Sequence, residues 1–370
     1  MSVLLKKSKF DAVSSKEIAE QIASKKKCKN KLPVWYNTPQ IYYPNKLNIE
    51  QTSSEETAKY KANLVTGNTL LDLTGGLGID SYFFSTKIER VFHCEIDSNL
   101  SLIAQHNFAV LNQKNITSFN VNGLEYLKDS ESKFDWIYVD PSRRHETKGK
   151  VAFLEDYTPD ITAYFDLLFN STENVLLKTA PLLDLSAGLS SLKFVKEIHI
   201  VAVNNEVKEL LWVLKKGFLD NPIIKTIHLK KAKIETFNFK RTDEEASNSD
   251  FSEPLKYLYE PNVALLKGGC FKLIGEHFKL FKLHQHTHLY TSNELIDFPG
   301  RRFLIVNCLP YQKTTIKKFG LLQANVATRN FPQSVASIRK KHKIKDGGEQ
   351  YLFFFKNHLE KYQILHCIKA

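Results

Sequence analysis

The chain has 370 residues, of which 42% are hydrophobic and 25% are charged. This balance is typical of a soluble globular protein of two or three domains, and it excludes a mainly disordered or fibrous chain. Lys and Arg total 52 against 40 Asp and Glu, a formal net charge of +12, which indicates an anionic partner, nucleic acid above all.

The sequence carries no signal for a membrane or for export. No apolar run approaches the roughly 18 residues that span a bilayer, and the start MSVLLKKSKF lacks the long apolar stretch of a secretory signal. The five cysteines lie far apart and form no CxxC pair, which argues against a disulfide framework and a zinc knuckle. We therefore expect a reduced, cytoplasmic protein without a membrane partner.

Residues 1–65 are predicted to form a helical N-terminal segment. The stretch EQTSSEETA carries a capping-box pattern, either Ser53 with Glu56 or, as a poorer match, Ser54 with Thr57. The first residue of such a box accepts a hydrogen bond from a backbone N–H of the first helical turn. We therefore expect a helix to begin there.

Short apolar runs alternate with helical stretches from Thr69 to about Gly217. This alternation predicts an α/β domain over 66–237 with a mostly parallel, Rossmann-like sheet and helices on both faces. Two strand-like runs flank Asn204 and Asn205 and predict an antiparallel hairpin at the end of this sheet. The predicted strands cover 69–73, 91–95, 116–121, 134–139, 174–178 and 195–203.

The polar stretch 238–254 indicates a linker or a long surface loop, and residues 255–370 are typical of a smaller α+β region. Between Arg301 and Lys345 the chain holds 11 Lys or Arg residues and no Asp or Glu. We interpret this segment as a surface for RNA or DNA, because phosphate neutralisation supplies most non-specific affinity. A solvated basic face is the alternative. The candidate contacts are Arg329, Arg339, Lys340, Lys341, Lys343 and Lys345.

The clearest functional pattern is LDLTGGLGID (71–80), which ends a predicted strand and opens a helix. Glycines lack a Cβ and let the backbone approach a ligand closely, while Asp72 is placed to hold an ammonium group. The segment matches neither GxGxxG nor a P-loop, so a tight turn without a ligand is the alternative. The glycines are Gly75, Gly76 and Gly78.

Two more polar side chains follow the next predicted strands. Glu95 ends the second strand, 23 residues after Asp72, where a carboxylate accepts hydrogen bonds from both hydroxyls of a ribose. Asn122 ends the third strand, where its side-chain carbonyl either accepts from an adenine amino group or caps the next helix. A glycine turn together with an acidic strand end is a more specific signal than either alone.

Asp140 closes the fourth strand in FDWIYVDPSRR (134–144), at the edge where open α/β sheets bind ligands. The order of these motifs is similar to that of class I S-adenosylmethionine-dependent methyltransferases. More closely, the chain resembles the bacterial methyltransferases that carry a C-terminal THUMP-like domain. The matching segments are EQTSSEETA, LDLTGGLGID, CEID, DPSRR, EPNVALLK, THLYTS, FPGRRF, ATRNFP and KIKDGGEQYLF.

This resemblance covers nearly all of the chain beyond residue 50 and implies a modular architecture. A linker and a small ferredoxin-like module would occupy 238–283, and a THUMP-like domain would occupy 284–370. True THUMP domains bind structured RNA in RNA-modifying enzymes, so the resemblance implies an RNA partner by analogy. It also implies S-adenosyl-L-methionine as the cofactor.

The resemblance further implies a role for each candidate in the cofactor site. Asp72 would meet the amino group of the cofactor, Glu95 its ribose and Asn122 its adenine. The glycine turn that begins at Thr74 would wrap the methionine part, although many members have glycine in place of this threonine. Asp140 would bind at the same site and face the transferred methyl.

The target atom stays open between a base nitrogen and a ribose oxygen, because DPSRR replaces the (Asp/Asn)-Pro-Pro-aromatic motif of many amino-group methyltransferases. Asp140, Lys178 and Glu206 resemble the Asp–Lys–Glu set of 2′-O-methyltransferases, in which a lysine between carboxylates is tuned to deprotonate a hydroxyl. The alternative is that Lys178 and Glu206 only pair at the edge of the sheet. Arg143 and Arg144 would grip a substrate phosphate or form surface salt bridges.

Three histidines, His284, His286 and His288, recur at period two. This spacing would place all three on one face of a strand. We expect a solvated strand face or an RNA contact there, with metal binding as the less favoured alternative. No metal ligand is assigned.

Together these patterns predict an S-adenosylmethionine-dependent methyltransferase that acts on structured RNA, either tRNA or rRNA. Methyl transfer to DNA uses the same motifs. A non-catalytic RNA-binding or ribosome assembly factor that retains the fold is the alternative from another class, and the altered DPSRR segment keeps it open. A small-molecule methyltransferase would leave the C-terminal charge unexplained.

Overall fold

The N-terminal segment is helical, as the sequence predicts. Its helices are α1 (Ser15–Lys31), α2 (Pro33–Asn37), α3 (Lys46–Gln51) and α4 (Glu55–Ala62). Of the two predicted capping pairs, the second is confirmed: Ser54 is the N-cap of α4, and its Oγ accepts from the N–H of Thr57 at 3.3 Å. Ser53 does not cap the helix, because its hydroxyl donates instead to Asp80 Oδ2 at 2.8 Å.

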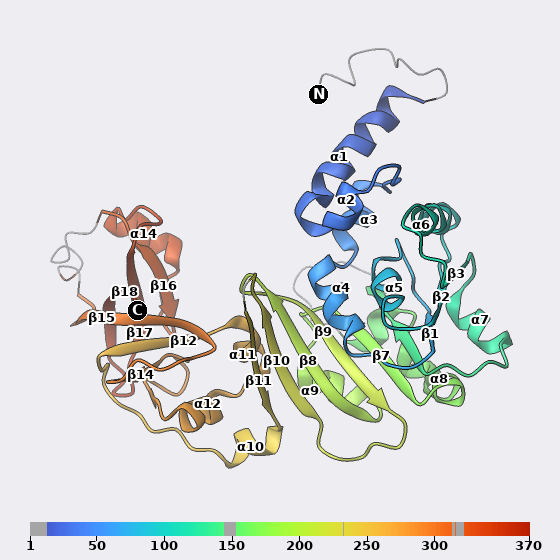
Figure 1. Ribbon diagram of the computed structural model, residues 1–370. Coiled ribbons are helices and arrows are strands. Elements are labelled where there is room, and N and C mark those ends of the chain that lie inside the picture. Colours follow the sequence, from blue (N-terminus) through green and yellow to red (C-terminus); the bar gives the residue numbers. More distant parts are fainter. Residues whose placement is uncertain (1–12, 144–152, 232, 313–314, 316–321) are drawn as a thin grey trace. The chain divides into compact units, whose positions relative to one another are not determined.

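The computed structural model (Figure 1) describes residues 13–143, 153–231, 233–312, 315 and 322–370. Contacts divide the chain into two compact units. The first unit consists of Met1–Ile198 and Glu209–Asp220, and the second of His199–Lys208 and Asn221–Ala370.

A largely parallel sheet forms the centre of the first unit and confirms the predicted α/β fold. From one edge its strand order runs β3-β2-β1-β4-β7-β9-β8 and then continues with two further strands described below, nine in all within the described residues. Strand β1 pairs in parallel with both β2 and β4. Apolar side chains of the central strands are fully buried, as expected where helices cover both faces of a parallel sheet. The strands are β1 (Thr69–Asp72), β2 (Arg90–Cys94), β3 (Ile116–Phe119), β4 (Trp136–Val139), β7 (Asn174–Thr179), β8 (Val195–Val203) and β9 (Glu206–Lys215).

The predicted hairpin between β8 and β9 forms, but it does not simply extend the sheet. Asn204 and Asn205 have φ values of 51° and 60°, the left-handed conformation that both central residues of a type I′ turn require. After this turn β9 pairs with β7 in the antiparallel sense. The later strand therefore fills the position next to β7, and β8 lies outside it.

Helices and short elements connect the strands of the first unit. Several helices begin at a polar N-cap, as with Asp97 and Asp184, whose carboxylates accept from backbone N–H groups of the first turn. These elements are α5 (Ile79–Phe84), α6 (Ser98–Val110), α7 (Gly123–Asp129), β5 (Ser142–Arg143), η1 (Leu154–Asp156), β6 (Tyr157–Thr158), η2 (Ile161–Tyr164), α8 (Phe165–Ser171) and α9 (Leu185–Ser191).

The second unit begins with an antiparallel pair, β10 (Ile223–Leu229) and β11 (Ile234–Phe239). Helix α10 (Arg241–Ala246) follows within the stretch predicted as a linker or loop. The remaining described residues form a sheet of order β13-β14-β12-β15-β18-β17-β16 with helices beside it, which confirms the smaller α+β region. These elements are β12 (Tyr257–Pro261), α11 (Val263–Gly268), α12 (Phe271–Phe278), β13 (Phe281–Lys282), β14 (Tyr290–Ser292), β15 (Gly300–Pro310), β16 (Asn325–Arg329), α14 (Val335–His342), β17 (Gln350–Lys356) and β18 (Tyr362–Lys369).

This second sheet has a separate apolar core on each face, because successive residues of β17 point in opposite directions. Phe353 and Phe355 pack with Phe303 on one face. Leu352 and Phe354 pack on the other face, together with buried residues that include Ile338 of α14. Helix α14 therefore covers one face and presents its polar side to solvent.

Candidate active site

The turn between β1 and α5 contains two left-handed glycines, Gly76 with φ of +57° and Gly78 with φ of +80°. A Cβ at Gly75 or Gly78 would lie 2.2 Å from a neighbouring ring, so packing requires glycine at both positions. A Cβ at Gly76 would meet nothing closer than the carbonyl oxygen of Thr74, at 3.9 Å. The backbone at Gly76 therefore borders open space, where a ligand can approach it closely.

Asp72 ends β1 beneath this turn and is only 1% exposed. Its Oδ1 accepts from the N–H of Thr74 at 3.1 Å, and its Oδ2 accepts from the hydroxyl of Ser81 at 2.6 Å. Burial raises the pKa of Asp72 to about 7 despite these two donors, and the negative charges of Asp80 and Asp140 add to the rise. Such a carboxyl group would be stabilised in its charged form by a bound cation.

Glu95 holds the glycine turn against the end of β2. Its Oε2 accepts from the N–H of Gly76 at 2.8 Å, and its Oε1 accepts from the N–H of Asp97 at 2.7 Å. Two apolar residues are exposed just beyond strands β2 and β3. Ile96, 71% exposed, lies two residues after the end of β2, and Val121, 38% exposed, lies two residues after the end of β3. Sequence reasoning missed this apolar pair, although an isoleucine directly after Glu95 is visible in the sequence.

Asn122 takes the role of a helix cap. Its Oδ1 accepts from the N–H of Leu124 at 3.0 Å, at the start of α7. The capping alternative is therefore confirmed, and its contact with an adenine stays a prediction.

Asp140 is held from two directions at the end of β4. Its backbone N–H donates to Thr74 Oγ1 at 2.7 Å, and its Oδ2 accepts from Lys178 Nζ at 2.5 Å. The hydroxyl at position 74 thus joins the glycine turn to the end of β4, a bond that glycine could not make. Thr74 fits without strain because its φ is not positive.

Lys178 is a poor candidate for the general base that the sequence suggested. Burial opposes its charged form, but the negative charges of Asp140, Glu209 and Asp80 outweigh burial and raise the pKa of Lys178. The side chain is therefore a fixed cation at neutral pH. Glu206, the third member of the predicted set, is 72% exposed and pairs with Lys208 at 2.6 Å. The glutamate that acts on Lys178 is Glu209, three residues along the same strand.

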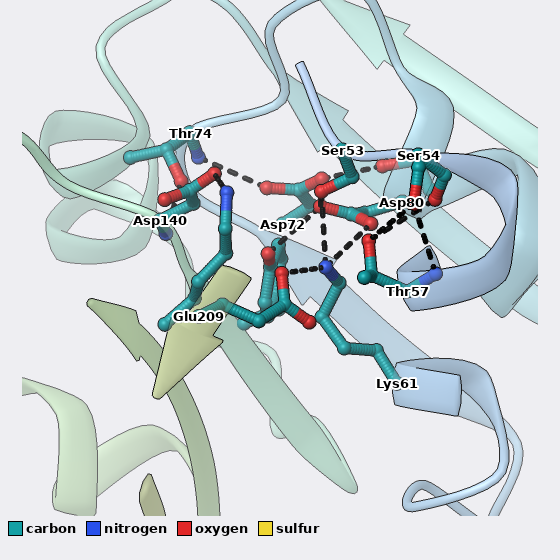
Figure 2. A network of polar contacts seen from close by, with 12 residues as sticks. Ser53, Ser54, Thr57, Lys61, Asp72, Thr74, Asp80, Asp140 and Glu209 are labelled. Atoms are coloured by element: carbon teal, nitrogen blue, oxygen red, sulfur yellow. Dashed lines mark hydrogen bonds and ion pairs between the residues drawn. The ribbon is translucent and has the colours of Figure 1, made fainter. Parts of the chain in front are cut away.

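A buried polar network lies beside Asp140 and Lys178 and includes Lys61 of α4 (Figure 2). Lys61 Nζ lies 2.8 Å from Glu209 Oε2 and 3.2 Å from Asp80 Oδ1, and it also donates to Ser53 Oγ at 3.0 Å. Asp80 Oδ2 accepts from the hydroxyls of Ser53 and Tyr138, each at 2.8 Å. Sequence reasoning missed these residues, because single polar residues on separate elements leave no pattern in the chain.

The predicted RNA contacts of the second unit fall into two groups. Arg329, Arg339 and Lys341 have partners within the protein: Arg329 pairs with Glu260 at 2.6 Å, Arg339 with Asp346, and Lys341 Nζ lies 3.0 Å from the Tyr311 hydroxyl. The side chains in the second group are exposed, and they are Lys340, Lys343 and Lys345. In the first unit, Arg144 lies outside the described residues, and Arg143 is described only as backbone of β5.

The three histidines do not share a strand face, so that prediction is wrong. They lie in and beside a turn between β13 and β14, which His284 helps to hold through Glu360 Oε1 at 2.7 Å and the N–H of His286 at 2.9 Å. His288 instead stacks on Phe271 with ring centroids 3.7 Å apart. Among the described residues, no group of three or more His, Cys, Asp or Glu side chains could hold a metal ion.

Comparisons with known proteins agree with this geometry. Residues 257–299 match a ferredoxin-like domain, and residues 300–369 match a THUMP domain-like family. The chain is 33% identical to a crystallised Porphyromonas gingivalis W83 protein assigned as a methyltransferase, with a TM-score of 0.91 over 100% of this chain and 94% of that one.

Two curated relatives extend the comparison. An uncharacterized S-adenosylmethionine-dependent methyltransferase of Mycobacterium tuberculosis is 21% identical over 272 residues, which cover 73% of this chain and 71% of that protein. Ribosomal RNA small subunit methyltransferase J of Francisella tularensis is 32% identical over 81 residues, 20% of this chain and 34% of that protein.

The strand order, the glycine turn and the acidic strand ends define a class I S-adenosylmethionine-dependent methyltransferase, with S-adenosyl-L-methionine as its cofactor. Within this class, the chain belongs to the family of methyltransferases that carry ferredoxin-like and THUMP-like domains. The two matches meet at residues 299 and 300, whereas the sequence placed that boundary at 283 and 284. Within the described parts of the chain, every helix is too short or too polar to span a bilayer.

Proposed function

We propose that this methyltransferase acts on structured RNA, either tRNA or rRNA. The observation that carries the proposal is the joining of a cofactor site to a THUMP-like match over 300–369 in one chain. The partial similarity to a ribosomal RNA methyltransferase supports the same substrate class.

The residues of the glycine turn fit S-adenosyl-L-methionine, which supplies an electrophilic methyl group when bound. The open side of Gly76 admits the methionine part, and the buried carboxyl of Asp72 would be its ammonium partner. Each oxygen of Glu95 accepts one backbone N–H and keeps a lone pair for a ribose hydroxyl. Exposed Ile96 and Val121 would cover the adenine.

Asp140 would orient the target group, because its carboxylate is fixed by Lys178 and its backbone by Thr74. Alignment of the nucleophile with the methyl group supplies much of the rate of such a transfer. A ribose hydroxyl also needs a base, and the raised pKa of Lys178 keeps this lysine protonated. An amino nitrogen needs only an acceptor for its N–H, which Asp140 provides. We therefore favour a base nitrogen over a ribose oxygen as the target.

The exposed lysines of α14 and the following turn would be the main contacts to RNA. Lys340, Lys343 and Lys345 are exposed, whereas Arg329 and Arg339 already neutralise carboxylates of this protein. An exposed lysine gains more from a phosphate than one that must first leave a partner, because the released counterions drive binding.

The test is methyl transfer from labelled S-adenosylmethionine to total RNA from cells that lack this gene, with nucleoside mass spectrometry of the product. We expect a methylated base nucleoside with the wild-type protein and none with Asp140→Ala. A ribose-methylated product would contradict the choice of target atom. No product, despite measurable binding of cofactor and RNA, would favour a non-catalytic assembly factor.

A further inference from the structure

Lys61 is a fully buried lysine, 0% exposed, that enters the active-site edge from a helix outside the sheet. Its ammonium group contacts Glu209, Asp80 and Ser53 at distances of 2.8 to 3.2 Å. Glu209 and Ser53 accept hydrogen bonds from this ammonium group, whereas Asp80 Oδ1 contributes an ion pair without a hydrogen bond. Two hydrogen bonds and two carboxylates therefore offset the burial of this charge, and a single residue of α4 pairs with both Glu209 and Asp80 beside Asp140 and Lys178.

One carboxylate oxygen of Glu209 accepts no hydrogen bond within the described residues. Its Oε2 contacts Lys61, while Oε1 is buried and has no hydrogen-bond partner among the described residues. Lys178 of β7 lies opposite Leu211 of β9, so Glu209, two residues from Leu211, points to the same face of the sheet. The negative charges of Asp140, Glu209 and Asp80 all act on Lys178. Two carboxylates, those of Asp140 and Glu209, therefore compete for the ammonium group of Lys178.

We propose that Lys61 is a positioning residue that keeps the ammonium group of Lys178 paired with the carboxylate of Asp140. By neutralising Glu209 and Asp80, Lys61 removes most of the attraction that would draw Lys178 away from Asp140. This inference rests on the proposed function, since it assumes that Asp140 orients the target group. It makes Lys61 of α4 and Ser53 of the EQTSSEETA segment part of the active centre, because Ser53 accepts a hydrogen bond from Lys61.

The inference predicts a pattern that a purely structural ion pair would not produce. Lys61→Met leaves Glu209 without a cation, so Lys178 turns toward it and Asp140 loses its partner. Lys61→Met combined with Glu209→Gln removes the competing charge, so Lys178 returns to Asp140. Asp80 keeps the hydroxyls of Ser53 and Tyr138 as donors in both variants.

Kinetics on RNA test this pattern. We expect Lys61→Met to lower kcat at least tenfold while the KM for S-adenosylmethionine changes less than threefold, and the double variant to regain kcat to within threefold of wild type. Lys59→Met is the matched control, since Lys59 lies on the same helix with its side chain 59% exposed and pairs with Glu55; it should leave kcat unchanged. Thermal unfolding of all variants shows whether a lower kcat reflects a lower stability of the variant rather than a displaced Lys178.

A second measurement needs no RNA and so separates this inference from the proposed function. NMR of the protein with ¹⁵N-labelled lysine side chains detects the buried ammonium groups, and Lys178→Arg assigns the signal of Lys178. We expect this signal to shift in Lys61→Met and to return in the double variant. An unmoved signal in Lys61→Met, or an equal shift in both variants, overturns the positioning role, even if the wild-type protein methylates no RNA.

Discussion

The protein uses charge in two different ways in its two units. In the first unit, buried Lys61 contacts the buried carboxylates of Glu209 and Asp80. Beside them Lys178 contacts Asp140, and their side chains are 14% and 31% exposed. On the THUMP-like module, Lys340, Lys343 and Lys345 are exposed. Buried charges need fixed partners, because desolvation is costly, whereas exposed charges attract a polyanion with little demand on geometry.

This difference separates what each set of charges can do. A buried charge that moves changes the alignment of reacting groups and therefore the rate of methyl transfer. An exposed charge that is removed changes the affinity for RNA and its dependence on salt. Substitutions in the first unit should therefore act on kcat or cofactor affinity, and substitutions in the second on RNA binding.

The largest effect is expected from Asp140→Ala. We expect kcat to fall at least about 100-fold, because loss of the carboxylate removes the acceptor that aligns the target group. Cofactor affinity, measured by calorimetry, should change less than threefold. Asp129→Ala at the exposed end of α7 is the control for loss of one negative charge. A parallel collapse of cofactor affinity would instead show that Asp140 acts mainly on the cofactor.

The sequence predicted the elements of the large sheet well, because periodic apolar runs and turn residues are local signals. The Asn204–Asn205 turn and the six predicted strands are examples. The contact of Thr74 with Asp140 could not be predicted in the same way. It depends on β1 and β4 lying side by side, although 66 residues separate the two partners.

The same limit applies to Lys61 and to the histidines. Lys61 and Glu209 are 148 residues apart, and nothing in either segment shows that both side chains turn inward. The period-two spacing of His284, His286 and His288 was typical of a strand, but contacts of His284 with Glu360 and Asn330 hold the segment as a turn. Tertiary contacts decide such positions, and one sequence does not display them.

The next effect is a contrast between two glycines of the same turn. Gly76→Ala places a Cβ in the open space beside the turn, where it would meet the cofactor. We expect cofactor affinity to fall about 5- to 150-fold, which corresponds to ~1–3 kcal/mol of overpacking, together with a loss of about 1–2 kcal/mol of stability, because φ at this position is +57°. Gly75→Ala places its Cβ 2.2 Å from the ring of His93, so we expect a loss of stability without a matching loss of cofactor affinity. Calorimetry with cofactor and thermal unfolding distinguish the two. An unchanged cofactor affinity in Gly76→Ala would show that the space at Gly76 is not a binding site.

A smaller effect is expected from the exposed lysines. Replacement of Lys340, Lys343 and Lys345 by Gln should weaken RNA binding about tenfold at physiological salt and make the slope of log K against log salt shallower by about 3, one for each lost phosphate contact. The matched control replaces three exposed lysines of the first unit, Lys87, Lys114 and Lys128. Fluorescence anisotropy over a salt series measures both quantities, and a similar loss in the control would assign RNA binding to overall charge.

The smallest effect concerns pH and the carboxyl of Asp72, whose pKa burial raises to about 7. Because the folded pKa lies above the unfolded value of about 4, this group contributes stability that is full below pH 4 and is lost as pH rises through 7. Cofactor affinity should change in the opposite direction, because the ammonium of the cofactor needs an ionised partner. We expect that affinity to rise about eightfold from pH 6 to pH 7.5.

Asp72→Asn shows whether the pH dependence of stability and of cofactor affinity comes from Asp72 or from other titrating groups. The variant cannot ionise at this position, so its stability should no longer fall through pH 7, and its cofactor affinity should be low and nearly independent of pH. Thermal unfolding without cofactor and calorimetry with it, both over the pH series, measure the two trends. If the variant keeps the wild-type rise in affinity, the ammonium partner is a different group. The buried charge at the end of β1 would then serve the fold through Ser81 and Thr74 alone.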